Sequence, residues 1–213
     1  QFISLVGNAI IAFPVAVGIG WAYFYLTGTH IATVDKANTL INELNILKSP
    51  AIFHAAIAGV YLMLSGLVSG YYENLWVYHN FQKRLSRNPN LVKIFGTDRM
   101  KSFTAYLGRN IGGITGNIFL GIMLGSTSTF GKALGFPLDI RHITFASGNF
   151  GIAFEALNYQ VEKSIIINSI AGIAVIGLIN VLVSFVLSIT IALLSRGTKF
   201  NEIKLLVSKL LRQ

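Results

Sequence analysis

The sequence contains little charge, and long parts of it contain none. Four stretches of at least 22 residues have no Asp, Glu, Lys or Arg, namely 1–34, 49–72, 110–131 and 164–195. About 20 apolar residues in a helix cover the roughly 30 Å of hydrocarbon in a bilayer. Four such runs in 213 residues leave little soluble domain that could bury them. The sequence therefore predicts an all-α, polytopic transmembrane helical bundle.

Cysteine is also absent, which excludes disulfides, thiolate metal sites and cysteine nucleophiles. The four histidines are scattered and lack the spacing of metal ligands. We therefore expect no metal site and no cofactor, and no combination of residues indicates a catalytic site. A hydrophobic fraction of 53% and a mean hydropathy of +0.63 fit helices that face acyl chains.

Basic residues are concentrated in two segments, 73–103 and 196–213. An excess of Lys and Arg marks the cytoplasmic side of a membrane, so we expect both segments in the cytoplasm. The predicted spans are 2–27, 51–72, 104–125 and 165–194. Basic segments can also bind nucleic acid. Attraction to anionic lipid headgroups accounts for the same charges, which makes nucleic acid the weaker interpretation.

The chain begins inside an apolar run that no charged segment precedes. We therefore expect residues 1–213 to be one transmembrane domain from the C-terminal part of a longer protein. Apolar residues recur at helical spacing over 34–47 and predict an amphipathic helix that Ser49-Pro50 ends. This helix should lie flat on the outer membrane face or cap the bundle. In the basic segment 73–103 we expect short helices broken at 88–90 and 95–98.

Small residues at four-residue spacing predict close helix packing in the third span, because lipid supplies no hydrophobic drive between helices. The glycines concerned are Gly108, Gly112, Gly116, Gly121 and Gly125. Asn117 lies in the middle of the same span. Its amide is expected to find a partner in the protein interior or in a water-filled cavity.

The region 126–158 is predicted to be re-entrant. Ser126-Thr127-Ser128-Thr129 and Gly131 should break the third span, and the uncharged run 143–154 is too short to cross a bilayer. We expect Pro137 to fix the entry of this segment and Ser147-Gly148-Asn149 to break its helix. Both of its sides should pack against the third span near Asn117.

Ionisable residues flank this segment and are the candidate ligand or gate residues of the chain. Asp139, Arg141 and His142 form its densest cluster, and we expect Asp139 or Arg141 to pair with a group from another segment. Glu155 could reach the same face. A salt bridge at the interface explains the cluster structurally, whereas ionisable groups at membrane depth commonly serve a function. The full set of ligand or gate candidates is Asp139, Arg141, His142, Asn117, Asn149 and Glu155.

The segments Asn117–Ser126 and Gly135–Asn149 resemble the signature of the bacterial site-specific recombinase family of integral membrane proteins, the Gcr type. The resemblance is strongest over about residues 70–160. It implies a bacterial inner-membrane protein whose full-length members carry a large N-terminal region. The adjacent Arg141-His142 does not match the Arg, His-x-x-Arg and Tyr set of a tyrosine recombinase.

Three functions remain open from the sequence. The broken segment and its charges favour a transport, channel-like or lipid-handling membrane domain, whose partner is the bilayer. Glycine-rich packing and the lack of a catalytic set favour a structural subunit, assembled with other membrane subunits or as a homo-oligomer. Membrane-linked site-specific DNA recombination is favoured by the resemblance alone.

Overall fold

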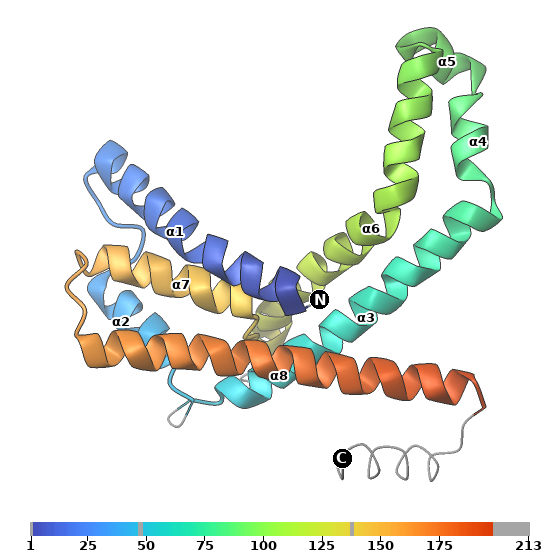
Figure 1. Ribbon diagram of the computed structural model, residues 1–213. Coiled ribbons are helices and arrows are strands. Elements are labelled where there is room, and N and C mark those ends of the chain that lie inside the picture. The colour runs from blue at the N-terminus through green and yellow to red at the C-terminus, as the bar shows by residue number, and fades with distance from the viewer. Residues whose placement is uncertain (1, 47–48, 137–138, 198–213) are drawn as a thin grey trace. The chain divides into compact units, whose positions relative to one another are not determined.

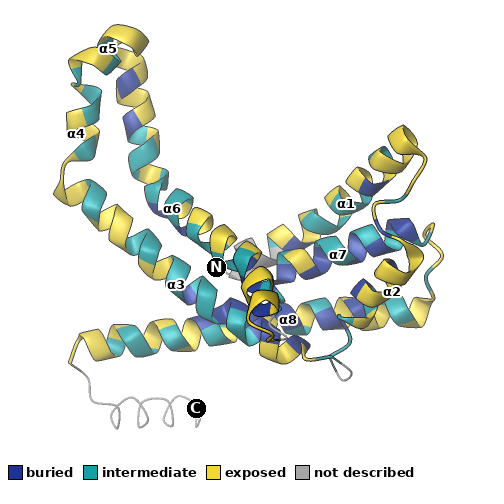
Figure 2. Ribbon diagram, turned by 180° about the vertical axis from the view of Figure 1, so that it is seen from behind, coloured by how far each residue is buried: buried dark blue, intermediate teal, exposed yellow. Residues whose placement is uncertain are grey.

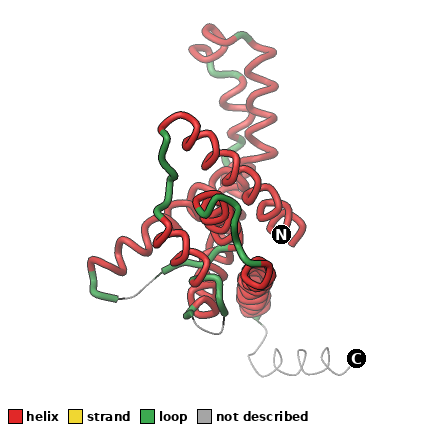
Figure 3. The backbone as a smooth tube through the Cα atoms, turned by 90° about the vertical axis from the view of Figure 1, so that its left-hand side faces the viewer, coloured by secondary structure: helices red, strands yellow, loops and turns green. Residues whose placement is uncertain are grey.

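The computed structural model describes residues 2–46, 49–136 and 139–197, and these residues form eight helices joined by loops and turns (Figures 1 and 3). The helices are α1 (Phe2–Thr27), α2 (Val34–Asn42), α3 (Ala51–Tyr78), α4 (Phe81–Ser86), α5 (Pro89–Phe95), α6 (Thr97–Ala133), α7 (Ile143–Ala156) and α8 (Lys163–Ser195). The predicted all-helical fold is confirmed. Two sequence predictions concern residues outside the described ranges. They are the role of Pro137 at the entry of the re-entrant segment and the cytoplasmic location of residues 198–213.

Four of these helices, α1, α3, α6 and α8, are long and apolar enough to span a membrane. They correspond to the four predicted spans. Two of them extend beyond the predicted limits, because α3 continues to Tyr78 and α6 begins at Thr97 and ends at Ala133. At 37 residues, α6 is roughly 55 Å long, well beyond the thickness of the hydrocarbon layer.

The predicted break of the third span at 126–131 is wrong, because α6 is continuous through it. The hydroxyl groups of Ser126 and Thr127 donate to the carbonyl oxygens of Ile122 and Met123, each over 2.7 Å. A hydroxyl that bonds to the carbonyl four residues earlier is satisfied inside its own helix. A cluster of Ser and Thr therefore need not end a helix.

The predicted breaks in the basic segment are confirmed, since α4, α5 and α6 are separated at these positions. The Oδ1 atom of Asn88 accepts hydrogen bonds from the backbone N–H groups of Asn90 and Leu91. Pro89 occupies the first turn of α5, where its missing N–H has no helical partner to lose. Asn88-Pro89 thus ends one helix and begins the next.

The chain divides into two compact units. Unit 1 contains residues 1–60 and 131–213, and unit 2 contains residues 61–130. Helices α3 and α6 each contribute to both.

In unit 2, α3 and α6 run antiparallel and approach each other closely at glycines of α6. A Cβ atom on Gly116 would lie 3.1 Å from the carbonyl oxygen of Ser65, whose hydroxyl donates to the carbonyl of Gly116 over 2.8 Å. Gly112 faces Ser69 and Glu73, and Gly108 faces Trp76. The predicted packing role of these three glycines is confirmed.

Gly121 and Gly125 do not lie at this contact, and their predicted packing role stays a prediction. Both are exposed, and a Cβ atom added to either would meet nothing within 4 Å in the described part of the chain. The four-residue spacing continues there after a shift of one position. That shift turns the second glycine pair away from the face that packs on α3.

Gly116→Leu is expected to destabilise the α3–α6 pair by about 1–3 kcal/mol, because a branched side chain must displace the backbone of Ser65. Gly121→Leu is the matched control, as it adds the same side chain to an open position of the same helix. Thermal unfolding in detergent measures both. Equal melting temperatures for the two variants would show that the face around Gly116 tolerates side chains.

In unit 1, α7 is enclosed by α1, α2 and α8, and Figure 2 shows its ribbon largely in the colour of buried residues. Helices α1 and α7 run side by side in the same direction. The hydroxyl of Ser147 donates to the carbonyl of Ala9 over 2.6 Å. A Cβ atom on Gly151 would lie 2.7 Å from the carbonyl oxygen of Phe13. The absence of a side chain at Gly151 therefore permits the close approach of α7 to α1.

The amphipathic helix forms as α2 but is shorter than predicted, ending at Asn42 rather than near residue 47. Its buried residues, Ala37 and Leu40, pack in a cluster with Ala153 and Ala156 of α7. Among the two expected placements, this contact is the capping one, since the apolar face of α2 covers α7.

Candidate functional site at the two ends of helix α7

Helix α7 is a short buried helix with ionisable residues at both ends. Its 14 residues extend over roughly 21 Å, which is less than the hydrocarbon thickness. The predicted break at Ser147-Gly148-Asn149 is wrong, because the helix is continuous from Ile143 to Ala156. The Ser147 hydroxyl is used in the bond to α1, so it does not compete with the helix backbone.

The N-terminal end of α7 is held by Asn180, a fully buried residue of α8. Its Oδ1 atom accepts a hydrogen bond from the N–H of Ile143 over 3.0 Å. Its Nδ2 atom donates to the carbonyl oxygens of Ala55 and Arg141, over 2.8 and 3.0 Å. One amide therefore joins α3, α8 and the start of α7, and satisfies backbone groups that a buried helix end leaves without partners.

Arg141 lies two residues before the start of α7, and its guanidinium group forms two ion pairs. Its Nη2 atom is 2.7 Å from Oδ2 of Asp139 and 3.1 Å from Oε2 of Glu43. The side chain of Arg141 is 12% exposed. The prediction that one of these residues pairs with a group from another segment is confirmed, since Glu43 follows α2. Asp139 and Arg141 can also face each other because they lie in a loop rather than on a helix.

His142 is the N-cap residue of α7, and its Nδ1 atom accepts a hydrogen bond from the N–H of Thr144 over 3.4 Å. It lies outside the four candidate spans. Burial lowers the pKa of its ring from 6.5 to about 4. The ring is therefore neutral at pH 7. This agrees with the hydrogen bond from Thr144, because only an unprotonated ring nitrogen can accept one.

At the other end of α7, the carboxyl group of Glu155 is buried and has one polar partner. Its Oε1 atom lies 3.0 Å from Nδ1 of His30, while the Glu155 residue is only 2% exposed. Its Oε2 atom is buried and has no hydrogen-bond partner among the described residues. A Cβ atom on Gly20 would lie 2.9 Å from Oε2, so this glycine of α1 makes room for the carboxyl group.

His30 connects the buried carboxyl group with the surface. Its side chain is 23% exposed, in contrast to 3% for the side chain of Glu155. The ring stacks on Phe24 at a centroid distance of 4.5 Å, which fixes its orientation. The pair thus places one ionisable group inside unit 1 and a second at its boundary.

An apolar groove of about 400 Å³ runs along α7 and is lined by three residues from each of α1, α7 and α8. Its aromatic residues are Phe13, Phe150 and Phe154, whose rings lie 5.5 to 6.1 Å apart. All of its lining helices belong to unit 1. The lining is apolar apart from Ser147, so the groove suits an acyl chain better than a polar solute.

The other predicted site residues are not drawn into one site. Glu155 does not reach the Asp139–Arg141 cluster, because the length of α7 separates them. Asn149 is half-buried in α7. Asn117 is exposed on α6, and the expected partner of its amide, in the protein interior or in a water-filled cavity, stays a prediction. Its predicted proximity to α7 stays a prediction.

Metal ligation has no support in the described ranges 2–46, 49–136 and 139–197, where no three His, Asp or Glu side chains gather as ligands.

Comparison with known proteins gives one match, to the family model described as site-specific recombinase, over residues 1–213. The chain belongs to the site-specific recombinase family. No curated protein and no solved structure matches it.

In this member of the family, three residues of the α7 site escaped the sequence interpretation, namely Asn180, His30 and Glu43. Asn180 had a usable signal, because an asparagine within the charge-free run 164–195 needs buried partners as much as Asn117 does. His30 and Glu43 had none. Each lies more than 90 positions from its partner in sequence, and only the tertiary fold brings them together.

Coupling within the arginine cluster can be measured with a double-mutant cycle. Asp139→Asn and Arg141→Gln are each expected to destabilise the protein, with an interaction energy of about 0.5–3 kcal/mol because the two groups form one pair. Chemical denaturation in detergent measures all four proteins of the cycle. Additive effects near zero would reduce the cluster to interfacial charges without a structural role.

Proposed function

We propose that this protein is a transport-class domain of the bacterial inner membrane, in which Glu155 and His30 bind and release a proton. The observation that carries the proposal is the buried Glu155 carboxyl group with its second oxygen unpaired. An ionised carboxylate is costly in a low-dielectric environment unless it is paired and hydrogen-bonded. Ionisable residues inside membrane segments commonly mark proton relays or ion pathways.

The partner of Glu155 supports a relay rather than a fixed salt bridge. Either ring nitrogen of a histidine can donate or accept a proton. The Nδ1 atom of His30 lies 3.0 Å from Glu155, a distance at which a proton can pass between the two groups. Because the His30 ring is partly exposed, it can exchange that proton with water.

Proton flux into liposomes tests the proposal. Purified protein is reconstituted with a pH-sensitive dye inside the vesicles, and an imposed pH difference is followed over time. The wild type should dissipate the difference at least about tenfold faster than Glu155→Gln, since an amide cannot carry a proton and general acid–base groups typically contribute 10²–10⁴-fold. Glu162→Gln is the control, because Glu162 is an exposed carboxylate nearby in sequence.

Equal flux for wild type and Glu155→Gln, or flux no faster than in protein-free vesicles, would contradict the relay. The orientation of the domain is a separate part of the proposal, with residues 83–101 in the cytoplasm. A cysteine introduced at Ser86 should then resist a membrane-impermeant thiol reagent added to intact cells. Residues 1–213 contain no cysteine that would interfere.

Lipid handling is the second candidate function, favoured by the apolar groove along α7. The groove is lined by Phe13, Phe150 and Phe154, and its volume of about 400 Å³ suits part of an acyl chain. Retention of lipid by the purified protein, and its loss in Phe150→Ser, would support this function.

A structural role and DNA recombination receive less support. Asn180 bonds to the backbone at the start of α7, and Arg141 pairs with Glu43. Such fixed contacts would also suit a structural subunit of a larger membrane complex or of a homo-oligomer. Recombination needs arginine and histidine side chains that hold a DNA phosphate. Arg141 is instead engaged with Asp139 and Glu43, which leaves its positive charge compensated.

A further inference from the structure

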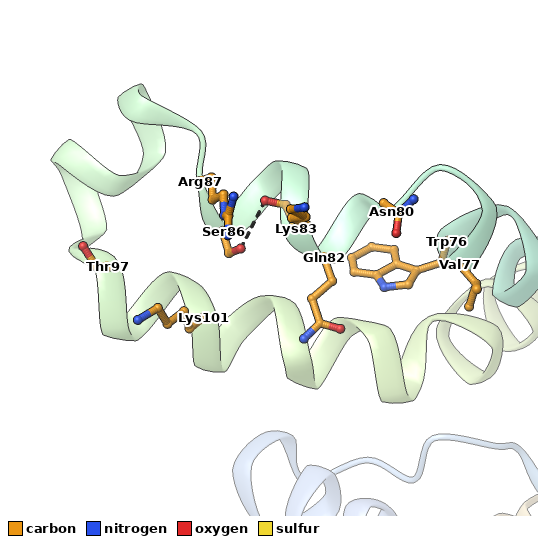
Figure 4. Close-up of a pocket in the computed structure, with 9 residues that line it drawn as sticks. All are labelled: Trp76, Val77, Asn80, Gln82, Lys83, Ser86, Arg87, Thr97 and Lys101. Atoms are coloured by element: carbon orange, nitrogen blue, oxygen red, sulfur yellow. Dashed lines mark hydrogen bonds between the residues drawn. The ribbon is translucent and has the colours of Figure 1, made fainter.

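Unit 2 contains a polar pocket whose lining includes no residue of α7 and neither His30 nor Glu155. It has a volume of about 630 Å³ and lies between α4, the end of α3 and the first turns of α6 (Figure 4). The indole ring of Trp76 forms one wall, beside Asn80 and Gln82 in the close-up. All of these residues belong to residues 61–130.

The charge of the pocket is of one sign. Lys83, Arg87 and Lys101 line it, and its lining includes no Asp or Glu. The carboxylate of Asp98 lies 3.7 Å from Nζ of Lys101. Both side chains of that pair are largely exposed, so the pair is weak and readily exchanged for another anion. The hydroxyl of Thr97 and the amide of Asn80 add hydrogen-bond donors, whereas the hydroxyl of Ser86 donates to the carbonyl of Lys83.

We propose that this pocket binds the phosphate of an anionic phospholipid headgroup. Arginine and lysine together supply a fork of donors and a point charge, which are the groups that bind phosphate oxygens. Basic pockets between transmembrane helices are places where anionic headgroups bind. The pocket volume of about 630 Å³ lies within the usual range of ligand-binding clefts and leaves room for a headgroup.

The surroundings of the pocket indicate a lipid rather than a free anion. Large apolar side chains are exposed on the neighbouring α5 and on the start of α6, including Ile94, Phe95 and Phe103. Trp76, Tyr78 and Tyr106 add interfacial aromatic rings on α3 and α6. Exposed apolar and aromatic residues next to basic ones form the pattern of a segment seated at the boundary between headgroups and acyl chains.

Lipid retention measured by native mass spectrometry tests the site. The full chain is reconstituted in phosphatidylcholine bilayers with a minor fraction of phosphatidylglycerol, and bound lipid is counted after extraction. Lys83→Gln/Arg87→Gln should retain at least about tenfold less phosphatidylglycerol than the wild type, since it removes charge-assisted hydrogen bonds to the phosphate together with the charge. Arg84→Gln/Lys93→Gln removes the same charge outside the pocket and should lower retention by a smaller factor, because it loses only the general attraction of a basic surface.

Three results would overturn the assignment. Equal losses in the two double variants would show general attraction of a basic surface. Displacement of phosphatidylglycerol by millimolar inorganic phosphate would assign the pocket to a free anion. A short DNA duplex that displaces the lipid, and that binds more weakly to Lys83→Gln/Arg87→Gln than to the control, would assign it to nucleic acid. Retention by the wild type and the control pair, resistant to both competitors, supports the lipid site.

Discussion

Asn180→Ala is expected to destabilise unit 1 by roughly 3 kcal/mol, because it leaves the buried N–H of Ile143 and carbonyl of Arg141 without partners. Average hydrogen bonds within membranes contribute less than this. Asn180 differs from an average case, since it is fully buried and its amide bonds to the backbone at a helix end. Loss of the amide should therefore loosen the start of α7 and its contacts with both α3 and α8.

Thermal and chemical unfolding in detergent measure this effect, with Asn117→Ala as the control. Asn117 lies in another apolar stretch but is exposed, so its removal should change stability by less than about 0.5 kcal/mol. Asn180→Asp gives a second comparison. It keeps the acceptor for Ile143 and loses the donor to Ala55 and Arg141. A melting temperature of Asn180→Ala equal to that of the wild type would show that α7 needs no anchor at this end.

Gly151→Leu is expected to have the second large effect, a destabilisation of about 3 kcal/mol, because the new side chain meets backbone rather than a movable side chain. A Cβ atom at this position would lie 2.7 Å from the carbonyl oxygen of Phe13 and 3.0 Å from Cβ of Ala16. Helices α1 and α7 would have to separate. That separation should also disturb the contact of Glu155 with Gly20, one turn further along the pair.

Gly148→Leu is the matched control on the same helix. A Cβ atom there meets nothing within 4 Å in the described structure, and leucine is a better helix former than glycine by up to about 1 kcal/mol. Gly148→Leu should therefore be neutral or stabilising. Similar losses of stability in both variants would mean that α7 rejects any bulk, and that the close approach to α1 is not specific to Gly151.

The limits of the sequence interpretation follow from the range of each signal. Charge-free runs and the turn residues Asn88-Pro89 act locally, so four long apolar helices and the breaks between the short ones could be predicted. Ser147-Gly148-Asn149 and Ser126–Thr129 are also local signals, but they misled. Their hydroxyl groups are satisfied by Ala9 or by the preceding turn, and tertiary packing keeps the helices intact.

Site residues were predictable in part for the same reason. Asp139, Arg141 and His142 are adjacent in sequence and meet at the start of α7, as their proximity suggested. Glu155 was expected on the same face as these residues, but 12 residues of continuous helix separate it from them. Its true partner, His30, lies 125 positions away, and no local pattern marks such a contact.

The protonation of Glu155 can be observed most directly by infrared difference spectroscopy on the reconstituted protein. Spectra recorded in mildly acidic and mildly alkaline buffer separate protonated carboxyl groups from carboxylates. The proton relay predicts a protonated-carboxyl band that Glu155→Gln abolishes and that His30→Phe shifts in its pH dependence. An identical difference spectrum for the wild type and Glu155→Gln would contradict the claim that this buried group binds and releases a proton.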